Sequence, residues 1–509
     1  SKVTAKTLGI PENAVKGLAI KRISLDARKK NDICFIYTVE ISLEPRDERR
    51  ILKRGLPTVC EAEAREIREV ATGSIPLDKP IIVVGMGPGG LFAAYTLAKH
   101  GYKPIVIERG EPIERRTLDV DVFWNGGRLR EDSNLMYGEG GAGAFSDGKL
   151  TTRIKDSRAH DVIDILADHG APKEIRLLAK PHIGTDILVK VVRSIREDIV
   201  RMGGDVRFSA KLVGLEKDSG DNITSVTVEK NGERERIPCS ACVLATGQGA
   251  RDTYHMLYDI GLELLPKAFA VGVRIEHPRE LIDRSQYGEF ASHPRLGAAE
   301  YHLADKAGNR GVYSFCMCPG GQVVASASEE GRVVTNGMSF HARNGKNANA
   351  AVVVSVGGKD FADDPRRAIA FQRELEARAY AAGRSAGEYA APAENIQSFL
   401  EGRGQLNIGR VQPTYDRGVA AADLGALLPQ ELAETLRAGL RAYERKIAGY
   451  TAPEAILTGL ETRTSSPVRL KREENFECTQ LAGLYPCGEG AGYAGGIMSA
   501  AVDGLRVAR

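Results

Sequence analysis

The chain has 509 residues, of which 42% are hydrophobic and 27% are charged, and its formal net charge is +3. This composition excludes a largely disordered or fibrous chain, and the small net charge disfavours a protein that binds polyanions over its whole surface. No apolar run approaches the roughly 18 residues of a membrane helix, and no apolar segment follows the first lysines. We therefore expect a cytoplasmic protein with no membrane span and no signal peptide. At about 100–200 residues per domain, the length predicts about three domains.

Residues 1–75 predict a small basic α+β domain. Residues 19–25 and 34–43 are rich in Ile, Val, Tyr and Phe and predict two strands, and the charged amphipathic pattern at 61–71 predicts a helix. Residues 1–54 contain 13 Lys or Arg against 7 Asp or Glu, a net charge of +6. A basic module can bind RNA or an acidic partner. No aromatic RNA-binding motif accompanies the charge, so we favour an ordinary solvated surface and keep nucleic-acid binding as the alternative.

Near residue 80 the pattern changes to a βαβ unit. Wholly apolar strands are predicted at 81–84 and 104–107, and a helix is predicted between them at 91–100. Further elements follow, namely a helix at 187–202 and strands at 205–209, 211–216, 223–230, 234–238 and 241–245. We assign residues 76–255 to the first part of a Rossmann-like domain.

Residues 256–450 predict a second, α+β domain inserted into the Rossmann-like one. Strands are predicted at 269–276, 312–317, 323–327 and 352–356, and helices at 366–382 and 429–447. Residues 451–509 return to the first domain and end in a helix at 497–509. The expected fold class is α/β, a Rossmann-like domain with an inserted α+β substrate domain and a small N-terminal α+β domain.

A glycine turn joins the first strand of the βαβ unit to its helix. Gly85, Gly87 and Gly90 match the G-x-G-x-x-G spacing, in which the glycines permit a tight turn, close approach to a pyrophosphate, and close packing of helix and strand. The pyrophosphate would lie at the helix N-terminus, where free N–H groups favour an anion. Glu108 ends the next strand and can accept hydrogen bonds from ribose hydroxyls. Together these features predict a dinucleotide site.

Three further stretches indicate which dinucleotide binds. An apolar strand ends in Ala245-Thr246-Gly247, a glycine-rich loop spans residues 139–149, and a second glycine-rich stretch spans 483–496 before the last helix. In these stretches the sequence resembles the two-dinucleotide-fold flavoproteins that bind FAD. It more closely resembles the uncharacterised family often labelled FAD-dependent dehydrogenases, to which the stretch at 461–468 is also similar.

The resemblance implies roles for matching positions. Gly488, Glu489 and Gly490 would bind the ribityl chain and pyrophosphate, although the family usually has Asp where this chain has Glu489. Gly495 and Gly496 would lie beside the flavin pyrimidine edge, and the helix starting at Ile497 would point its positive end at the flavin O2. The remaining implied contacts to FAD come from Arg109, Arg116, Gly141, Ala142, Gly143, Lys149 and, at the adenine end, Leu212.

Candidates for substrate chemistry are charged residues near the expected flavin ring. Lys149 and Asp147 lie in the glycine-rich loop, His277 ends a strand of the inserted domain together with Arg274, Glu276 and Arg279, and Arg463 lies near the C-terminal part. A lysine there can stabilise an anion, and a histidine can transfer a proton. Weaker candidates are Arg410, His341 and Arg343. None of these residues has the spacing of a zinc site or a hydrolase triad, so we predict no metal site.

Cys316 and Cys318 are two further candidates. On a strand, residues two apart share a face, so their sulfurs are either redox-active beside the flavin or packed as small apolar groups. Adjacent cysteines on the same face of one strand are poorly placed for an unstrained disulfide within that strand. We expect all eight cysteines to be free thiols in a reducing compartment.

We therefore expect an FAD-dependent oxidoreductase that moves a hydride between flavin N5 and a small-molecule substrate. The chain has no second G-x-G-x-x-G in a βαβ context, so NAD(P)H is expected, if at all, as a transient donor. The alternatives are a flavoprotein that acts on or binds RNA through residues 1–54 and a non-catalytic FAD sensor. The sequence leaves substrate, electron donor and oligomeric state open.

Overall fold

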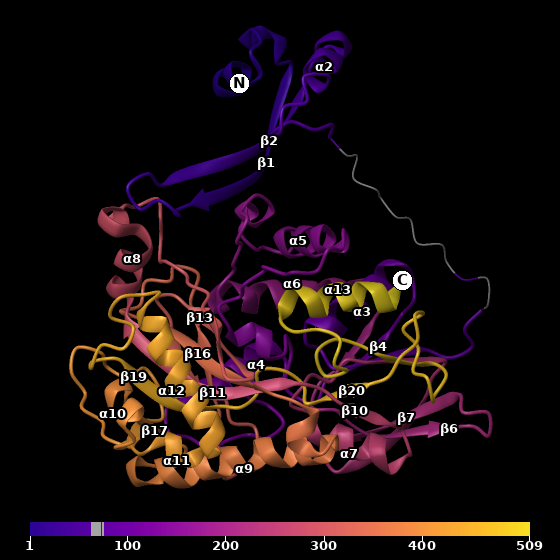
Figure 1. Ribbon diagram of the computed structural model, residues 1–509. Helices are drawn as coiled ribbons and strands as arrows, with labels where there is room; N and C mark the ends of the chain where they lie inside the picture. Colours follow the sequence, from indigo (N-terminus) through magenta and orange to yellow (C-terminus); the bar gives the residue numbers. More distant parts are fainter. Residues whose placement is uncertain (63–72, 74–75) are drawn as a thin grey trace.

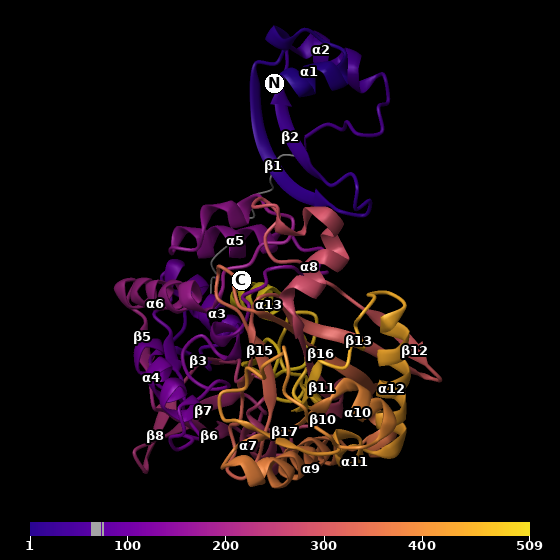
Figure 2. The same cartoon turned by 90° about the vertical axis from the view of Figure 1, so that its left-hand side faces the viewer.

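The computed structural model describes residues 1–62, 73 and 76–509 of the chain. A small N-terminal domain stands above a larger α/β body, and the body holds two main sheets (Figures 1 and 2). The helix predicted at 61–71 falls mostly on residues outside the described ranges. In the described part, no helix has the length and apolar character needed to cross a membrane.

The first sheet of the body has five parallel strands in the order β21-β9-β3-β4-β5. Their bounds are β3 (Ile81–Val84), β4 (Ile105–Ile107), β5 (Asp205–Arg207), β9 (Ala241–Leu244) and β21 (Leu484–Pro486). All four strand pairs are parallel, so both faces must be covered by other elements. The expected Rossmann-like α/β fold is confirmed.

Alternate residues of β3 point into two different cores. Val83 packs with the helices on one face, whereas Ile82 and Val84 pack with a small antiparallel sheet and a helix on the other. The helical face is formed by α3 (Pro88–Lys99), α5 (Arg158–Asp168), α6 (Thr185–Arg201) and α13 (Ile497–Ala508). The opposite face is formed by β6 (Lys211–Lys217), β7 (Ile223–Lys230), β8 (Glu233–Pro238) and α7 (Arg251–Asp259).

The second sheet has seven strands, mostly antiparallel, in the order β12-β13-β16-β11-β19-β17-β18. Its strands are β11 (Phe269–Pro278), β12 (Ala304–Ala307), β13 (Arg310–Cys318), β16 (Asn347–Val356), β17 (Ala391–Asn395), β18 (Val419–Ala421) and β19 (Ile456–Glu461). The elements around it are α8 (Arg279–Tyr287), β14 (Gln322–Ala325), β15 (Thr335–Met338), α9 (Pro365–Gly383), α10 (Ile396–Glu401), α11 (Leu424–Leu427) and α12 (Gln430–Glu444). The helices predicted at 366–382 and 429–447 are confirmed as α9 and α12.

One strand of this sheet lies beyond the expected domain boundary at residue 450. Strand β19 pairs with both β11 and β17 and so extends the second sheet to Glu461. The chain then returns to the parallel sheet through β20 (Val468–Leu470), which pairs with β10 (Leu264–Pro266). These two short strands tie together the points where the chain leaves and re-enters the first part of the body.

The N-terminal domain is a long hairpin carrying two short helices. The strands predicted near 19–25 and 34–43 are confirmed as β1 (Gly17–Asp26) and β2 (Cys34–Ser42), and a small core joins them to α1 (Lys2–Leu8) and α2 (Pro45–Leu52). The hairpin contacts the body through Ile23, whose backbone bonds with Leu177 and Ala179. Helix α4 (Ile113–Trp124) and the 3₁₀ turns at Glu12–Ala14, Ala142–Phe145, Lys173–Arg176, Gly288–Ser292, Gly358–Phe361 and Arg384–Ala386 complete the described elements.

Candidate functional site

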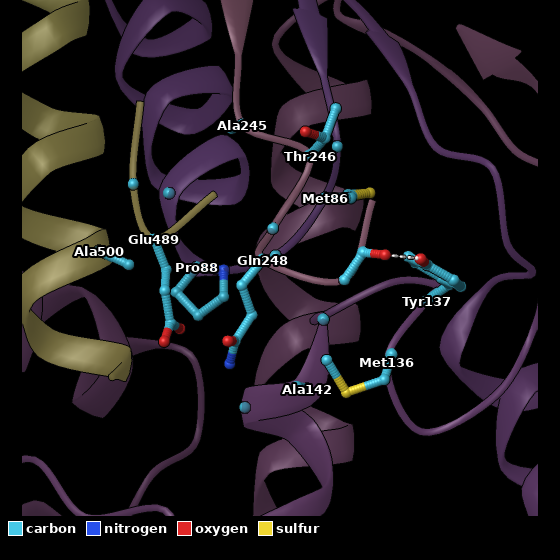
Figure 3. A pocket seen from close by; sticks show the side chains of 18 of the residues that line it. Met86, Pro88, Met136, Tyr137, Ala142, Ala245, Thr246, Gln248, Glu489 and Ala500 are labelled. Carbon is cyan, nitrogen blue, oxygen red and sulfur yellow. Dashed lines mark hydrogen bonds between the residues drawn. The ribbon is translucent and has the colours of Figure 1, made fainter. Parts of the chain in front are cut away.

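A cavity lies at the carboxyl ends of four strands of the parallel sheet. The residues that follow β3, β4, β9 and β21 all line it, and these are the turn at 85–89, Glu108, the segment 245–249 and the segment 487–489. Ligands of open α/β sheets bind at this edge. Figure 3 shows Met86, Ala142, Thr246 and Glu489 approaching the same space from separate segments.

The backbone conformation and close packing of the turn at 85–90 require glycine at two positions. Gly85 has φ +94°, and a Cβ there would lie 2.3 Å from the Ala245 carbonyl oxygen. A Cβ on Gly90 would lie 1.9 Å from the Gly85 carbonyl oxygen, so Gly90 serves close packing and does not line the cavity. Gly87 faces the cavity, and α3 begins at Pro88 with its N-terminus beside it. The turn therefore presents free backbone N–H groups where a pyrophosphate would bind.

Glu108 is almost fully buried and is anchored by backbone donors. Met86 N donates to one carboxylate oxygen at 2.7 Å, and Gly110 N and Gly138 N donate to the other at 2.9 and 3.0 Å. A carboxylate has about four acceptor positions, so about one is left for a ribose hydroxyl. Glu108 therefore joins the glycine turn to the glycine-rich loop.

The two arginines expected to contact FAD, of which Arg116 was the one expected at its phosphates, lie in different settings. Arg109 lines the cavity, where it stacks over the Tyr137 ring and pairs with Asp252 at 2.9 Å. Arg116 does not line the cavity, which corrects the expectation for it. Its guanidinium is fully buried and donates to the carbonyl oxygens of Asn134, Leu135, Gly138, Glu139 and Gly141, and burial lowers its pKa to about 10. Arg116 instead holds the glycine-rich loop in place.

The glycine-rich loop and the start of α13 meet across the cavity. A Cβ on Gly143 would lie 3.0 Å from the Ile497 side chain, and Gly496, with φ +98°, precedes the helix. Gly141, Ala142, Gly143, Lys149, Leu212, Ala245, Thr246, Gly247, Gly488, Glu489, Gly496 and Ile497 all line the cavity, whereas Gly490 and Gly495 do not. Gly490 packs against Gly247, where a Cβ would lie 2.4 Å from the Gly247 carbonyl oxygen.

Glu489 is a carboxylate with few partners. Burial raises its pKa to about 7, opposed by the charge of Lys267 and a hydrogen bond from the Gly496 N–H. A carboxyl group in this position accepts hydrogen bonds from ligand hydroxyls, such as those of a ribityl chain. The glycine turn, Glu108, Glu489 and the α13 N-terminus therefore form a set of groups that fits FAD.

The far end of the cavity is closed by the seven-stranded sheet and its neighbours. Phe315, Cys316, Asn336, Glu461 and Arg463 line this end. Sequence reasoning assigned no role to Phe315, Asn336 or Glu461. No motif marks Phe315 and Asn336, and Glu461 begins the stretch at 461–468 that carries the resemblance but was not placed at the site. Met136, Tyr137 and Gln248 also line the cavity and were missed as well; Gln248 donates to the Arg463 carbonyl oxygen at 2.9 Å.

Lys149 and Asp147 belong to a cluster of four charges at this end. The Asp147 carboxylate is buried and accepts from the Arg343 guanidinium, which also pairs with Glu300 at 2.8 Å. Lys149 Nζ lies 4.0 Å from Asp147 and 3.9 Å from Glu300, and it donates to the Met317 carbonyl oxygen. Lys149 is partly exposed to the cavity, so a cation is available there.

Arg463 is held in a buried ion-pair network. It donates twice to Glu376 at 2.9 Å, and Arg251 donates to the same carboxylate at 2.7 and 2.9 Å. The two guanidinium groups hold the pKa of Glu376 far below its usual range despite its burial. Arg463 therefore fixes the cavity wall, and most of its donors are already used.

His277 lies in the core of the second sheet and not at the cavity, which corrects the prediction of a catalytic role. Its Nε2–H donates to the Tyr450 carbonyl oxygen at 2.7 Å, and burial lowers its pKa to about 4. The neighbours Arg274 and Glu276 are also buried and bonded within the sheet. Strand alternation explains the placement, since His277 points to the face opposite that of Arg274. Three other candidates, Arg279, Arg410 and His341, do not line the cavity, because they contact Asp283, Glu280 and the Ile183 carbonyl.

Family models match most of the chain. Residues 79–258 match the model described as pyridine nucleotide-disulphide oxidoreductase, and residues 268–464 match the model described as FAD-dependent protein, C-terminal domain-like. Residues 1–42 match a domain of unknown function. The second match includes β19, so it extends past residue 450 as the seven-stranded sheet does.

Individual proteins are also similar to this chain. An uncharacterized protein of Clostridium beijerinckii is 49% identical over 511 residues, covering 100% of this chain and 94% of that protein. A fumarate reductase (cytochrome) of Shewanella frigidimarina is 23% identical over 39% of each chain. A solved geranylgeranyl bacteriochlorophyll reductase-like protein of Thermoplasma acidophilum is 13% identical, covers 84% of this chain and 77% of its own, and has a TM-score of 0.36, too low to inform function.

The fold and the cavity define a flavoprotein of the FAD-dependent oxidoreductase class. Within that class, the chain belongs to the uncharacterised FAD-dependent oxidoreductase family represented by the Clostridium beijerinckii protein.

Proposed function

We propose that this FAD-dependent oxidoreductase transfers a hydride between N5 of bound FAD and a small-molecule substrate seated against the second sheet. The observation that carries the proposal is the continuity of the cavity. It runs from the glycine turn at 85–89 to Cys316, Asn336 and Glu461 without an intervening wall. One space therefore serves both a dinucleotide and a second, smaller molecule.

Bound FAD would supply the two-electron chemistry, and the chain's own residues would position it. The turn at 85–89 and the N-terminus of α3 would hold the pyrophosphate, while Glu108 would accept from a ribose hydroxyl. Gly496 and the N-terminus of α13 would direct positive charge at one edge of the ring. The glycine-rich loop lets the backbone approach the opposite side closely, because Gly141 and Gly143 have no side chains there.

Lys149 would orient the substrate. Its ammonium group is the partly exposed cation at the substrate end, and only one of its three donors is committed, to the Met317 carbonyl oxygen. A substrate oxygen carrying negative charge can accept from the remaining donors. We propose NADH or NADPH as a transient electron donor that enters the same end.

The test is anaerobic reduction of the purified FAD-loaded protein by NADH and by NADPH, followed through the flavin absorbance. We expect one of them to bleach the flavin, and we expect Lys149→Gln to keep FAD but to slow reduction by about 10²-fold, a loss typical of removing one positioned donor. Lys155→Gln is the control, since Lys155 is exposed on the same segment. Flavin that dithionite bleaches but no nucleotide or candidate substrate does would favour the non-catalytic sensor.

A further inference from the structure

The strongest feature outside the cofactor cradle is the pair of cysteines at the end of β13. The strand is irregular there, because its pairing with β16 shifts register between Phe315 and Cys318. Cys316 occupies the left-handed region at φ +44°, which side-chain-bearing residues rarely adopt. Backbone of this kind persists only where its surroundings hold it, and it concentrates at functional sites.

Two cations bond to successive carbonyl oxygens of this irregular segment. Arg274 donates to the Cys316 carbonyl oxygen at 3.1 Å, and Lys149 donates to the Met317 carbonyl oxygen. Arg274 is itself fixed by Glu461 at 2.8 and 3.0 Å and by Asn349 at 2.7 Å. The segment is therefore locked between the substrate-end lysine and a fully buried ion pair.

The two cysteine sulfurs differ in their access to the cavity. Cys316 lines the cavity, whereas Cys318 is fully buried behind it. The Cys318 thiol donates to the Cys316 carbonyl oxygen, with its sulfur 3.3 Å from that oxygen. The hydrogen bond from Cys318, together with the charges of Arg274 and Lys149, lowers the pKa of the Cys316 thiol despite its burial. An accessible thiolate backed by a buried thiol is the arrangement of an attacking and a resolving cysteine.

We propose that Cys316 and Cys318 form a dithiol–disulfide couple that exchanges two electrons with FAD, and that the substrates are small disulfides or dithiols. The regular strand geometry that would oppose a disulfide between these positions is absent, because the bulge changes the direction of the backbone between them. This inference rests on the proposed function, since the flavin must be seated at the same end of the cavity.

The cysteine pair would reduce a substrate disulfide by two successive thiol–disulfide exchanges. The Cys316 thiolate attacks one sulfur of a substrate disulfide, which breaks its S–S bond and releases one thiol after protonation. Cys318 then loses its proton and attacks the Cys316 sulfur, which releases the second substrate thiol and forms the Cys316–Cys318 bond. The substrate gains two electrons and the cysteine pair loses two. Bound FAD would supply the two-electron chemistry that reduces the pair again, with a reduced nicotinamide nucleotide as the source of the electrons, and Cys316, which lines the cavity, would receive them.

The first test looks at the cysteine pair directly. Trypsin cleavage after Arg310 and Arg332 isolates both residues in one peptide that contains no other cysteine. The FAD-loaded protein is reduced, desalted, incubated with glutathione disulfide and alkylated before digestion. We expect the peptide to be lighter by two hydrogens and unalkylated, whereas the exposed Cys34 carries glutathione or the alkyl group. A peptide that carries two alkyl groups, or glutathione on Cys316 with Cys318 alkylated, would overturn the inference.

The second test links the pair to the flavin. Under anaerobic conditions dithiothreitol should bleach the bound flavin in the wild type and in Cys34→Ser, and bleaching should be lost in Cys316→Ser and Cys318→Ser. Equal bleaching in all four proteins would overturn the exchange with FAD. The FAD content and the thermal midpoint of each variant show whether it is folded. If a serine variant is misfolded, Cys316→Ala or Cys318→Ala is tested in its place. Failure of the proposed function alone would give a different result. NADH and NADPH would then leave the flavin oxidised, while the Cys316–Cys318 disulfide would still form in the peptide.

Discussion

Glu108 is predicted to stabilise the protein itself as well as its cofactor. In a conventional ribose-binding role, replacing this side chain would weaken FAD and leave the apoprotein unchanged. The structure gives Glu108 three backbone donors, Met86 N, Gly110 N and Gly138 N, at 2.7–3.0 Å around a carboxylate that is 4% exposed. Glu108→Ala would leave these three N–H groups without their acceptor.

The magnitude follows from the bonds that are lost. Hydrogen bonds to a charged group contribute about 1.5–3 kcal/mol each, so three set an upper limit of about 4.5–9 kcal/mol. Water and local relaxation recover part of this, and we expect a loss of about 3–5 kcal/mol in the unfolding free energy of the apoprotein. Loss of the one remaining ribose bond should weaken FAD about 10- to 100-fold in addition.

Urea unfolding of the apoprotein, followed by tryptophan fluorescence, measures the first effect. The chain has one tryptophan, Trp124, which packs edge-on against Phe145 of the glycine-rich loop and so reports on this region. Glu111→Ala is the matched control, because Glu111 makes a surface ion pair with Arg130 worth about 0–1 kcal/mol. An apoprotein of Glu108→Ala that unfolds within about 0.5 kcal/mol of the wild type would refute the anchoring role.

Two further predictions concern the packing of two glycines and the effect of pH on a buried histidine. Gly90→Ala should lose soluble, FAD-binding protein, since its Cβ would lie 1.9 Å from the Gly85 carbonyl oxygen, whereas Gly495→Ala meets no atom within 4 Å and should keep yield and thermal midpoint. Similar yields for the two would be inconsistent with the turn geometry. Burial lowers the pKa of His277 to about 4. The unfolded chain therefore binds its proton first, and stability should fall by at most about 3 kcal/mol as the pH drops from about 6.5 to 4. His277→Gln should flatten that part of the stability–pH curve and His302→Gln should not, and identical curves for the two variants would contradict the assignment.

Local sequence patterns were sufficient to predict the parallel-sheet domain and to select most of the glycine-turn and loop residues that line the cavity. The G-x-G-x-x-G spacing and the apolar strands depend on neighbouring residues, and residues such as Gly85 and Glu108 follow strands that are parallel neighbours. The carboxyl ends of such strands meet at one edge, so the clustering of these residues could be expected from the sequence alone. The N-terminal hairpin was predictable in the same way, from alternation and a polar turn.

The substrate end could not be predicted in this way, because long-range pairing creates it. Glu461 reaches Arg274 only because β19 crosses into the second sheet after the expected boundary. Arg116 looked like a phosphate ligand from its place in the sequence, and its true partners are carbonyl groups, which leave no mark in a sequence. His277 differed from the prediction because its side chain points to the sheet face opposite that of Arg274, whose partners Cys316 and Glu461 line the cavity.

The measurement that tests the FAD assignment most directly is the absorbance spectrum and flavin stoichiometry of the protein after incubation with FAD and gel filtration. We predict flavin bands with one FAD per chain in the wild type. We predict no bands for Gly87→Leu, because Gly87 lines the cavity and a Cβ there makes only an ordinary 3.7 Å contact with Gly141, so the larger side chain would occupy the pyrophosphate position without disturbing the turn. A folded wild-type protein that retains no flavin, or a folded Gly87→Leu variant that retains it fully, would contradict the placement of FAD in this cavity.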